Sequence, residues 1–483
     1  MTFGVRTRAK LYDLPRLALV AFATLVSSSV SAESLLYLEE VRESVRVHHP
    51  LVAQAFERQR RAEALRFAAS GYFDPSVKGQ VKATTGSFYE LRSLDLELRQ
   101  QTGIWGVEVY GGYRNAQGVG GGAYPSYYSD QTLPGGEFRV GAELPFLRDG
   151  PIDGGRARIW SAEALLLAAQ LGFERQRLEL ELAASKSYFR WVAAGHKLAI
   201  GEEILAIAEE RGSQLNERTA LGAASEFERL DNERMILERR ERLALALREF
   251  EQTSLELGLY VRTGHGERTI PGRPLVPQGW SEGFVRKLVQ AELERKLSSC
   301  HPQAQQLRAE LKSLEIELRL AQNQVFPDIT LGGQVSRDLG DANVNPALAG
   351  TVLEAQLKLT VPLLMRADRG QRDARSATVR EKQAELRFLS DRLKMLVDDL
   401  DSRERVALTR REQTAAQGDL ARKLATGERE RFESGASNLL FVNLRELAVA
   451  DAETRHVDAE AQLHEVTFEI RLFEGLSCRS VDG

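Results

Sequence analysis

The stretch ESGASNLLFV, residues 433–442, interrupts a long segment that otherwise has the pattern of a helix. A similar break, LGAASEFERL, lies at residues 221–230 in the first half of the chain. Each break contains a glycine, which tolerates the backbone conformation at the end of a helix, and a serine that can cap the next helix. Each is therefore predicted to be a turn between two antiparallel helices, either at the tip of the molecule or in its interior.

The two breaks belong to an internal repeat. HHPLVAQAFERQRRAEALRFAASGYFDP, from His48 to Pro75, is similar to HPQAQQLRAELKSLEIELRLAQNQVFPD, from His301 to Asp328. Next, VGAELPFLRDGPIDGGRAR at 140–158 matches LKLTVPLLMRADRGQRDAR further along the chain. The order of landmarks is the same in both halves: His-Pro, Phe beside Pro and Asp, a strand ending in Pro, and the glycine break. The chain is therefore predicted to contain two structural repeats.

Each repeat is predicted to be mostly helical. Charged residues make up 28% of the chain and aromatic residues only 7%, a composition typical of long helices. Apolar residues recur three and four positions apart, so each helix buries one stripe. The predicted helices are 35–48, 50–71, 155–219 and 226–260, then 282–299, 302–325, 369–432 and 438–474. At ~1.5 Å per residue, each long helix would span roughly 95–100 Å.

Strands are predicted between the helices. DITLGGQVSRD (328–338) and EAQLKLTVPL (354–363) alternate apolar and polar residues and are long enough to cross a bilayer when tilted. The first half has similar alternation at 76–84, 94–102, 105–114 and 137–146. Its strand region is longer, which indicates either two extra strands or, as the preferred interpretation, a longer surface loop. Four strands per chain cannot close a barrel alone, so three chains would form twelve strands.

Aromatic residues in the first strand region suit a membrane interface or the outer mouth of a barrel. They are Trp105, Tyr124, Tyr127 and Tyr128.

The chain begins with the pattern of an export signal. Basic residues precede the apolar run LALVAFATLV, and SSSVSA then supplies the small residues that a signal peptidase needs. Cleavage after Ala32 is predicted. No other window has the length and hydropathy of a transmembrane helix. Cleavage would remove four basic residues and one acid from a chain of net charge −4, so the mature chain would be near −7, which argues against nucleic acid as a partner.

No catalytic, cofactor-binding or metal site is predicted. The histidines do not form a ligand cluster, and GxSxG, HExxH and P-loop motifs do not occur. We therefore predict that the protein is not an enzyme and needs no cofactor. Cys300 and Cys478 form neither a zinc site nor a disulfide framework. In an exported protein they could pair, or they could remain free or buried thiols.

The ordered set of motifs resembles the TolC-like outer membrane efflux protein family, the outer membrane factors of tripartite efflux and type I secretion systems. The resemblance covers about 34–475 and rests on LLYLEEVRESVRVHHP, FPDITLGG, LKLTVPL and RFESGASNLLFVNLRELAVADAE. The implied domains are a signal peptide (1–32), a first TolC-like repeat (33–262, strands about 76–146), an equatorial linker (263–281), a second repeat (282–475, strands about 328–363) and a C-terminal tail (476–483).

The resemblance implies a mainly α fold with a β-barrel part. It implies a homotrimer with a twelve-stranded outer membrane β-barrel on a long periplasmic α-helical barrel. Such a trimer, embedded in outer membrane lipid, is a passive exit duct for efflux or secretion. It works with a periplasmic adaptor (membrane fusion) protein and an inner membrane pump or ABC exporter. The alternative is a periplasmic coiled-coil scaffold or adaptor without a pore, and the two differ over whether the strands face lipid.

In this family the Gly-x-x-Ser/Thr tips of the helical hairpins meet the adaptor. The matching residues are Gly222, Ala223 and Ser225 in the first half and Gly435, Ala436 and Ser437 in the second, where the match is one residue shorter.

In many members, carboxylates six and nine residues after the second glycine form a ring that narrows the tunnel. Here that count gives Phe441 and Leu444, which depart from the pattern, whereas the same count in the first half gives Glu228 and Asp231. Any constriction is therefore expected to be apolar or lined by this acidic pair. Alternatively, the apolar pair packs between helices, and the acids complement a helix N-terminus.

Overall fold

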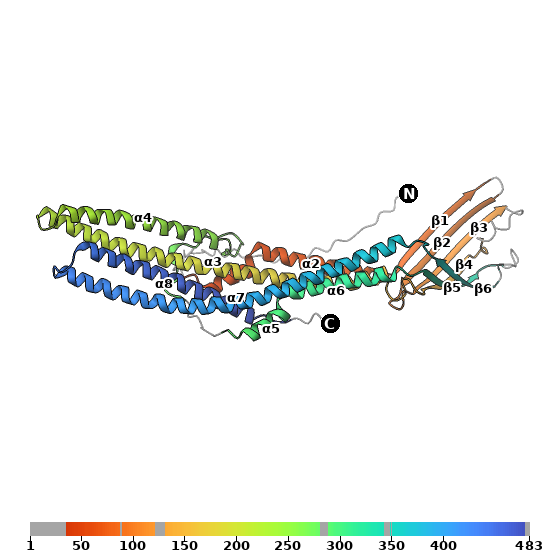
Figure 1. Ribbon diagram of the computed structural model, residues 1–483. Coiled ribbons are helices and arrows are strands. Elements are labelled where there is room, and N and C mark those ends of the chain that lie inside the picture. The colour runs from red at the N-terminus through yellow and green to blue at the C-terminus, as the bar shows by residue number, and fades with distance from the viewer. Residues whose placement is uncertain are drawn as a thin grey trace, which may run out of the picture.

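The computed structural model describes residues 35–86, 89–120, 131–280, 288–341, 348 and 350–478. The predicted signal peptide (1–32) and three of the aromatic residues lie outside these ranges; the three are Tyr124, Tyr127 and Tyr128. The described chain is an elongated helical body with a β-sheet at one end (Figure 1).

Seven helices lie within three residues of their predicted ranges. The helix predicted at 282–299 begins only at Gln290 among the described residues, and 282–287 lies outside them. The described helices are α1 (Leu38–His48), α2 (Pro50–Ser70), α3 (Gly154–Ala220), α4 (Glu226–Leu257), α5 (Gln290–Cys300), α6 (Pro302–Asn323), α7 (Arg366–Glu433) and α8 (Leu439–Glu474), with short 3-10 helices at Gly71–Phe73 and Arg273–Leu275. The two long helices have 67 and 68 residues. At ~1.5 Å per residue each is about 100 Å long.

The helices form two elongated hairpins that lie side by side (Figure 1). α3 packs against α4 on one stretch and against α2 on another, and α7 packs in the same way against α8 and α6. α3 also contacts α6 and α8, which joins the two halves of the chain. Two shorter helices therefore accompany each long one, and the turns between α3 and α4 and between α7 and α8 lie at the end away from the sheet.

The two His-Pro pairs each form a sharp junction between helices. His49 has extended backbone geometry between α1 and α2, and its imidazole Nδ1 accepts a hydrogen bond from the backbone N–H of Leu51 at 3.2 Å. His301 does the same between α5 and α6, with the N–H of Gln303 at 3.3 Å. Because proline disfavours helix in the residue before it, the sequence predicts the break. The capping role of the imidazole was not predicted.

The largest core cluster lies near the middle of the helical body. The Trp191 side chain on α3 is fully buried, and its indole N–H donates to the Ser254 hydroxyl on α4 at 3.1 Å. Val41 and Val45 bring the buried stripe of α1 to the same cluster. This core attaches the short first helix to the hairpin of α3 and α4.

Among the described residues, the sheet has six strands, all antiparallel and in sequence order. They are β1 (Ser76–Thr85), β2 (Tyr89–Gln101), β3 (Glu108–Gly120), β4 (Glu137–Pro145), β5 (Asp328–Asp338) and β6 (Thr351–Thr360). The preferred interpretation of the longer strand region as a surface loop is wrong, and the alternative of two extra strands is confirmed. β2 and β3 form a continuous ladder whose end pairs are Tyr89 with Gly120 and Gln101 with Glu108. The expected twelve-stranded barrel, which assumed four strands from each of three chains, therefore loses its basis.

The two faces of the sheet differ in polarity. Register places Val77 of β1 beside Leu98 of β2, and Leu331 of β5 beside Leu357 of β6, on a face of exposed apolar side chains. The opposite face carries ion pairs. On it, the Asp95 carboxylate of β2 pairs with Arg114 of β3 and with Arg139 of β4. No helix among the described residues is both long and apolar enough to cross a membrane.

Trp105 lies in the turn between β2 and β3, at the end of the sheet that meets the helices. Its indole lies where a side chain on Gly150, just before α3, would have to be. An outer mouth position for Trp105 is therefore wrong, because the turn from β2 to β3 is on the helical side.

Candidate functional site: the two hairpin tips

The first tip is a tight turn that ends α3. Gly222 has a φ of 66°, in the left-handed region that favours glycine. Its N–H donates to the carbonyl of Thr219 at 3.0 Å, and the N–H of Ala223 donates to the carbonyl of Arg218 at 2.7 Å. A side chain at Gly222 would meet no neighbour within 4 Å, so the backbone angle and not a lack of space requires glycine here.

The second tip repeats this geometry. Gly435 has a φ of 77°, and its N–H donates to the carbonyl of Phe432 at 3.0 Å. The N–H of Ala436 donates to the carbonyl of Arg431 at 2.7 Å. The two turns therefore satisfy the last carbonyls of α3 and α7 in the same way.

The residue that caps the second hairpin differs from the prediction. Asn438, not Ser437, caps α8, and its side-chain oxygen accepts from the N–H of Phe441 at 3.2 Å. Ser437 is still in the turn, and its hydroxyl donates to Glu428. Asn438 is thus the counterpart of Ser225, so the two turns have the same length and the expected one-residue difference is wrong.

At the first tip, Ser225 and Glu228 form a capping box at the start of α4. The Ser225 hydroxyl accepts from the N–H of Glu228 at 3.2 Å, and the Glu228 carboxylate accepts from the N–H of Ser225 at 3.0 Å. Asp231 forms an ion pair with Arg234 on the same helix at 3.2 Å. Both acids are half-buried and already have local partners.

Phe441 and Leu444 lie on the more exposed side of the first turns of α8. Both side chains are about half exposed, at 50% and 49%. The opposite side of the same helical turn buries Leu439, Val442 and Asn443. At the first tip, Phe227 is more exposed still, at 80%. Each tip therefore presents apolar side chains on its surface.

A cleft of about 770 Å³ lies between the two hairpins near their tips. Three of the predicted tip and constriction residues line it, namely Glu228, Gly435 and Ser437. Its walls also carry charges of both signs. The charged residues are Glu210, Arg211, Arg218, Glu228, Arg429 and Glu433.

Behind this cleft, the Glu446 carboxylate on α8 joins all four hairpin helices. It accepts from Arg211 of α3 at 3.0 Å and from Arg239 of α4 at 3.1 Å. Arg429 of α7 also donates to it, at 3.2 Å. Burial raises the pKa of Glu446, but the hydrogen bond from Arg211 and the charges of Arg211 and Arg239 outweigh it, so the pKa is lowered. We call Glu446 and these arginines the hairpin clamp.

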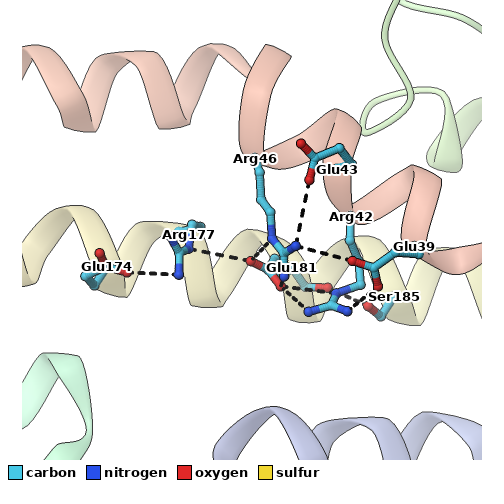
Figure 2. A network of polar contacts seen from close by, with 8 residues as sticks. All are labelled: Glu39, Arg42, Glu43, Arg46, Glu174, Arg177, Glu181 and Ser185. Atoms are coloured by element: carbon cyan, nitrogen blue, oxygen red, sulfur yellow. Dashed lines mark hydrogen bonds and ion pairs between the residues drawn. The ribbon is translucent and has the colours of Figure 1, made fainter. Parts of the chain in front are cut away.

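A second buried carboxylate holds α1 against α3 (Figure 2). Arg42 and Arg46 of α1 both reach Glu181 of α3, at 2.9 and 2.8 Å. Arg177, one turn before Glu181 on α3, lies on its other side. Burial raises the pKa of Glu181, but the hydrogen bonds from Arg46 and Arg42 lower it below its ordinary value. This network fixes the first helix to the long hairpin.

Cys300 and Cys478 are joined by a disulfide, with their Cα atoms 4.3 Å apart. Cys300 is the last residue of α5, and Cys478 follows α8. In the part of the chain that the structure describes, no group of three or more His, Cys, Asp or Glu side chains could hold a metal ion.

The fold is that of outer membrane channels of known structure. The Campylobacter jejuni CmeC outer membrane channel aligns with a TM-score of 0.63 and 13% identity over 98% of this chain and 96% of its own. The outer-membrane channel OprN aligns with a TM-score of 0.61 and 16% identity, covering 91% of this chain and 90% of its own. The outer membrane protein VceC of Vibrio cholerae has a TM-score of 0.60, 14% identity and coverages of 91% and 96%.

No protein-family model and no curated protein matches the sequence.

Proposed function

We propose that the protein is an outer membrane channel, a passive exit duct for efflux or secretion across the periplasm and the outer membrane. It works as a homotrimer and not as an enzyme. The proposal is supported by the likeness of the fold to outer membrane channels such as CmeC and OprN. The sequence motifs that resemble outer membrane factors support it independently.

The observation that carries the proposal is the two-faced sheet at one end of the long helices. On its apolar face, Val81 and Leu353 are about 80% exposed, at 79% and 80%. Water contact makes such a surface unfavourable by ~25 cal/mol per Å², whereas lipid matches it. The opposite face is polar and suits a water-filled interior. A sheet in lipid cannot keep open edges, so copies of the chain close it into a barrel.

The hairpin tips are the proposed docking site for a periplasmic adaptor. They lie at the end of the body opposite the sheet (Figure 1), where a partner anchored in the inner membrane would meet them. The cleft between the hairpins and the exposed Phe227 side chain supply apolar and charged contacts. The adaptor in turn connects the duct to an inner membrane pump or ABC exporter, which supplies the energy of transport.

For the constriction we propose the apolar pair Phe441 and Leu444. Both side chains are about half exposed, so they can line an interior formed by several copies. Glu228 is engaged in the capping box, which favours a local structural role for it. A ring of phenylalanine and leucine side chains would impede water and ions without any charged gate.

The experiment that tests the function combines fractionation with electrophysiology. The full-length precursor is expressed in a Gram-negative host, and the mature protein is located by separating inner from outer membranes. Purified protein is then added to a planar lipid bilayer. We expect outer membrane protein that gives discrete conductance steps. Protein confined to the soluble periplasmic fraction, without conductance, would instead support a scaffold without a pore.

A further inference from the structure

The first and last strands of the sheet each have an edge that pairs with no other described strand. β1 pairs only with β2, and β6 pairs only with β5. Their unpaired N–H and C=O groups would cost several kcal/mol each inside a bilayer. Because the proposed function puts this sheet in the membrane, both edges need a partner strand.

The two edges suit each other in direction and length. All five ladders are antiparallel, so in a sheet of six strands β1 and β6 run in opposite directions. When copies are arranged in a ring, β6 of one copy therefore lies antiparallel to β1 of the next. An odd number of strands would have made this pair parallel. Both strands have ten residues.

The two edges also suit each other in polarity. On the apolar face, Val77 and Val81 of β1 are exposed, as are Leu353 and Leu357 of β6. The ladders across the sheet place these odd-numbered residues on the same side. The even-numbered residues occupy the polar side: Lys78, Gln80 and Lys82 on β1, and Glu354, Gln356 and Lys358 on β6. Since a slip of one residue would exchange the faces, even positions must pair with even positions.

We propose that β6 of one copy pairs with β1 of the next and that three copies close an eighteen-stranded barrel. The inference rests on the proposed function, which supplies the three copies. It differs from the twelve-stranded barrel implied by the family resemblance because β2 and β3 add a hairpin to each chain. Barrel diameter grows roughly linearly with strand number, so this barrel is about one and a half times as wide.

The added hairpin also contributes to the wall of the pore. Its polar face carries Asp95, which pairs with Arg114 of β3 at 3.2 Å and Arg139 of β4 at 2.6 Å. Arg99 of β2 pairs with Glu108 of β3 on the same face. These ion pairs run across three neighbouring strands, so they line the wider interior rather than contact lipid.

Cysteine cross-linking in native outer membranes tests the β6–β1 seam. Gln80→Cys on β1 is combined with a second cysteine on β6, at an even position (Glu354→Cys, Gln356→Cys or Lys358→Cys) or at an odd control position (Ala355→Cys or Leu357→Cys). After mild oxidation, non-reducing electrophoresis counts the linked chains. The native disulfide joins residues of one chain, so it adds no link between chains. We expect at least one even pair to give species of two and three chains, and the odd pairs to give none.

The outcomes separate the inference from the proposed function. A series that stops at two chains would overturn the eighteen strands. Links at odd positions, or at none, would overturn the seam. A conducting outer membrane protein in these cases would leave the proposed function standing, whereas absence of the unmodified protein from the outer membrane would overturn the proposed function itself.

A second measurement avoids variants that fail to fold. Amide hydrogen exchange of the unmodified protein in mild detergent compares β1 and β6 with β3, which is paired on both sides. The seam predicts equal protection for all three strands. Rapid exchange at alternate residues of β1 and β6 would mean free edges and contradict it.

Discussion

Glu446 on α8 and Arg239 on α4 form a buried ion pair between the two helical hairpins. The Arg239 nitrogen and the Glu446 oxygen lie 3.1 Å apart, and the side chains of Arg239 and Glu446 are only 1% and 6% exposed. Arg211 and Arg429 donate to the same carboxylate, so three arginines share one acid. The Glu446 carboxylate stabilises the fold chiefly because its removal would leave buried guanidinium charges without a partner.

Glu446→Ala is therefore expected to destabilise the helical body strongly. Removing one partner of a buried ion pair typically costs about 3–5 kcal/mol, because the remaining charge stays out of water. Denaturant unfolding of the detergent-solubilised protein, followed by the helical circular dichroism signal, measures the loss. The matched control is Glu453→Ala on the same helix, whose exposed pair with Arg422 is expected to contribute less than about 1 kcal/mol. Equal effects of the two variants would show that the hairpin clamp has no special weight.

The burial of His301 predicts that the stability of the fold depends on pH. Burial, and to a smaller extent the charge of Arg175, lowers the pKa of His301 from 6.5 to about 4 in the folded chain. The unfolded chain therefore takes up the proton first. The contribution of the neutral imidazole is complete above pH 6.5 and is lost as the pH falls from 6.5 towards 4, by about 3 kcal/mol in all.

His301→Asn isolates this effect. Asparagine can still cap α6 but does not titrate. We expect the difference in unfolding free energy between the two proteins to change steadily between pH 6.5 and 4, with the histidine protein losing more. A constant difference across this range would contradict the assignment, since carboxylates common to both proteins cancel.

The disulfide between Cys300 and Cys478 encloses α6, β5, β6, α7 and α8 in one covalent loop, with a sequence separation of 178 residues. A loop of this length is expected to restrict the unfolded chain by up to about 5 kcal/mol in the chain-entropy model. Cys300→Ser and Cys478→Ser should each lower the thermal midpoint, and the double variant should lower it no further than either one. If the double variant lowered the thermal midpoint by the sum of the two single losses, the two cysteines would contribute independently and not as one disulfide.

The proposed constriction predicts a change in conductance. Phe441→Ala and Leu444→Ala remove half-exposed apolar side chains near the second tip, so single-channel conductance in a planar bilayer should rise. Glu228→Gln keeps the size of the side chain and should leave conductance nearly unchanged, because this carboxylate caps α4. A rise with Glu228→Gln alone would favour an acidic constriction instead.

The proposed docking surface predicts a loss of adaptor binding without a loss of conductance. Phe227→Ser removes an apolar side chain that is 80% exposed at the first tip. Leu245→Ser is the control, since this residue is also exposed on α4 but lies farther from the tip. Cross-linking to the adaptor in intact cells should weaken only with Phe227→Ser. Equal weakening by both variants would point to a general effect on the helix.

The sequence predicts most of the helical framework because each boundary has a local cause. Proline sets the junctions after His49 and His301, and glycine sets the turns at Gly222 and Gly435. Between these boundaries, the spacing of apolar residues predicts the helices themselves. The predicted and observed ranges of α3 differ by only one residue at each end.

The features that the sequence did not predict depend on distant partners. β2 and β3 alternate correctly, but only their pairing distinguishes two strands from a loop. The hairpin clamp was missed because Glu446 is one acid among many on charged helices, and its arginines lie on three other helices. The cap at Asn438 was missed because a serine one residue earlier has the same capping preference.

The central claim is that several copies of this chain form one outer membrane channel. The most direct test is the mass of the mature protein, extracted in mild detergent from isolated outer membranes and measured by light scattering with the detergent contribution subtracted. We expect a species of three times the chain mass. A monomer, or protein found only in the soluble periplasmic fraction, would contradict it.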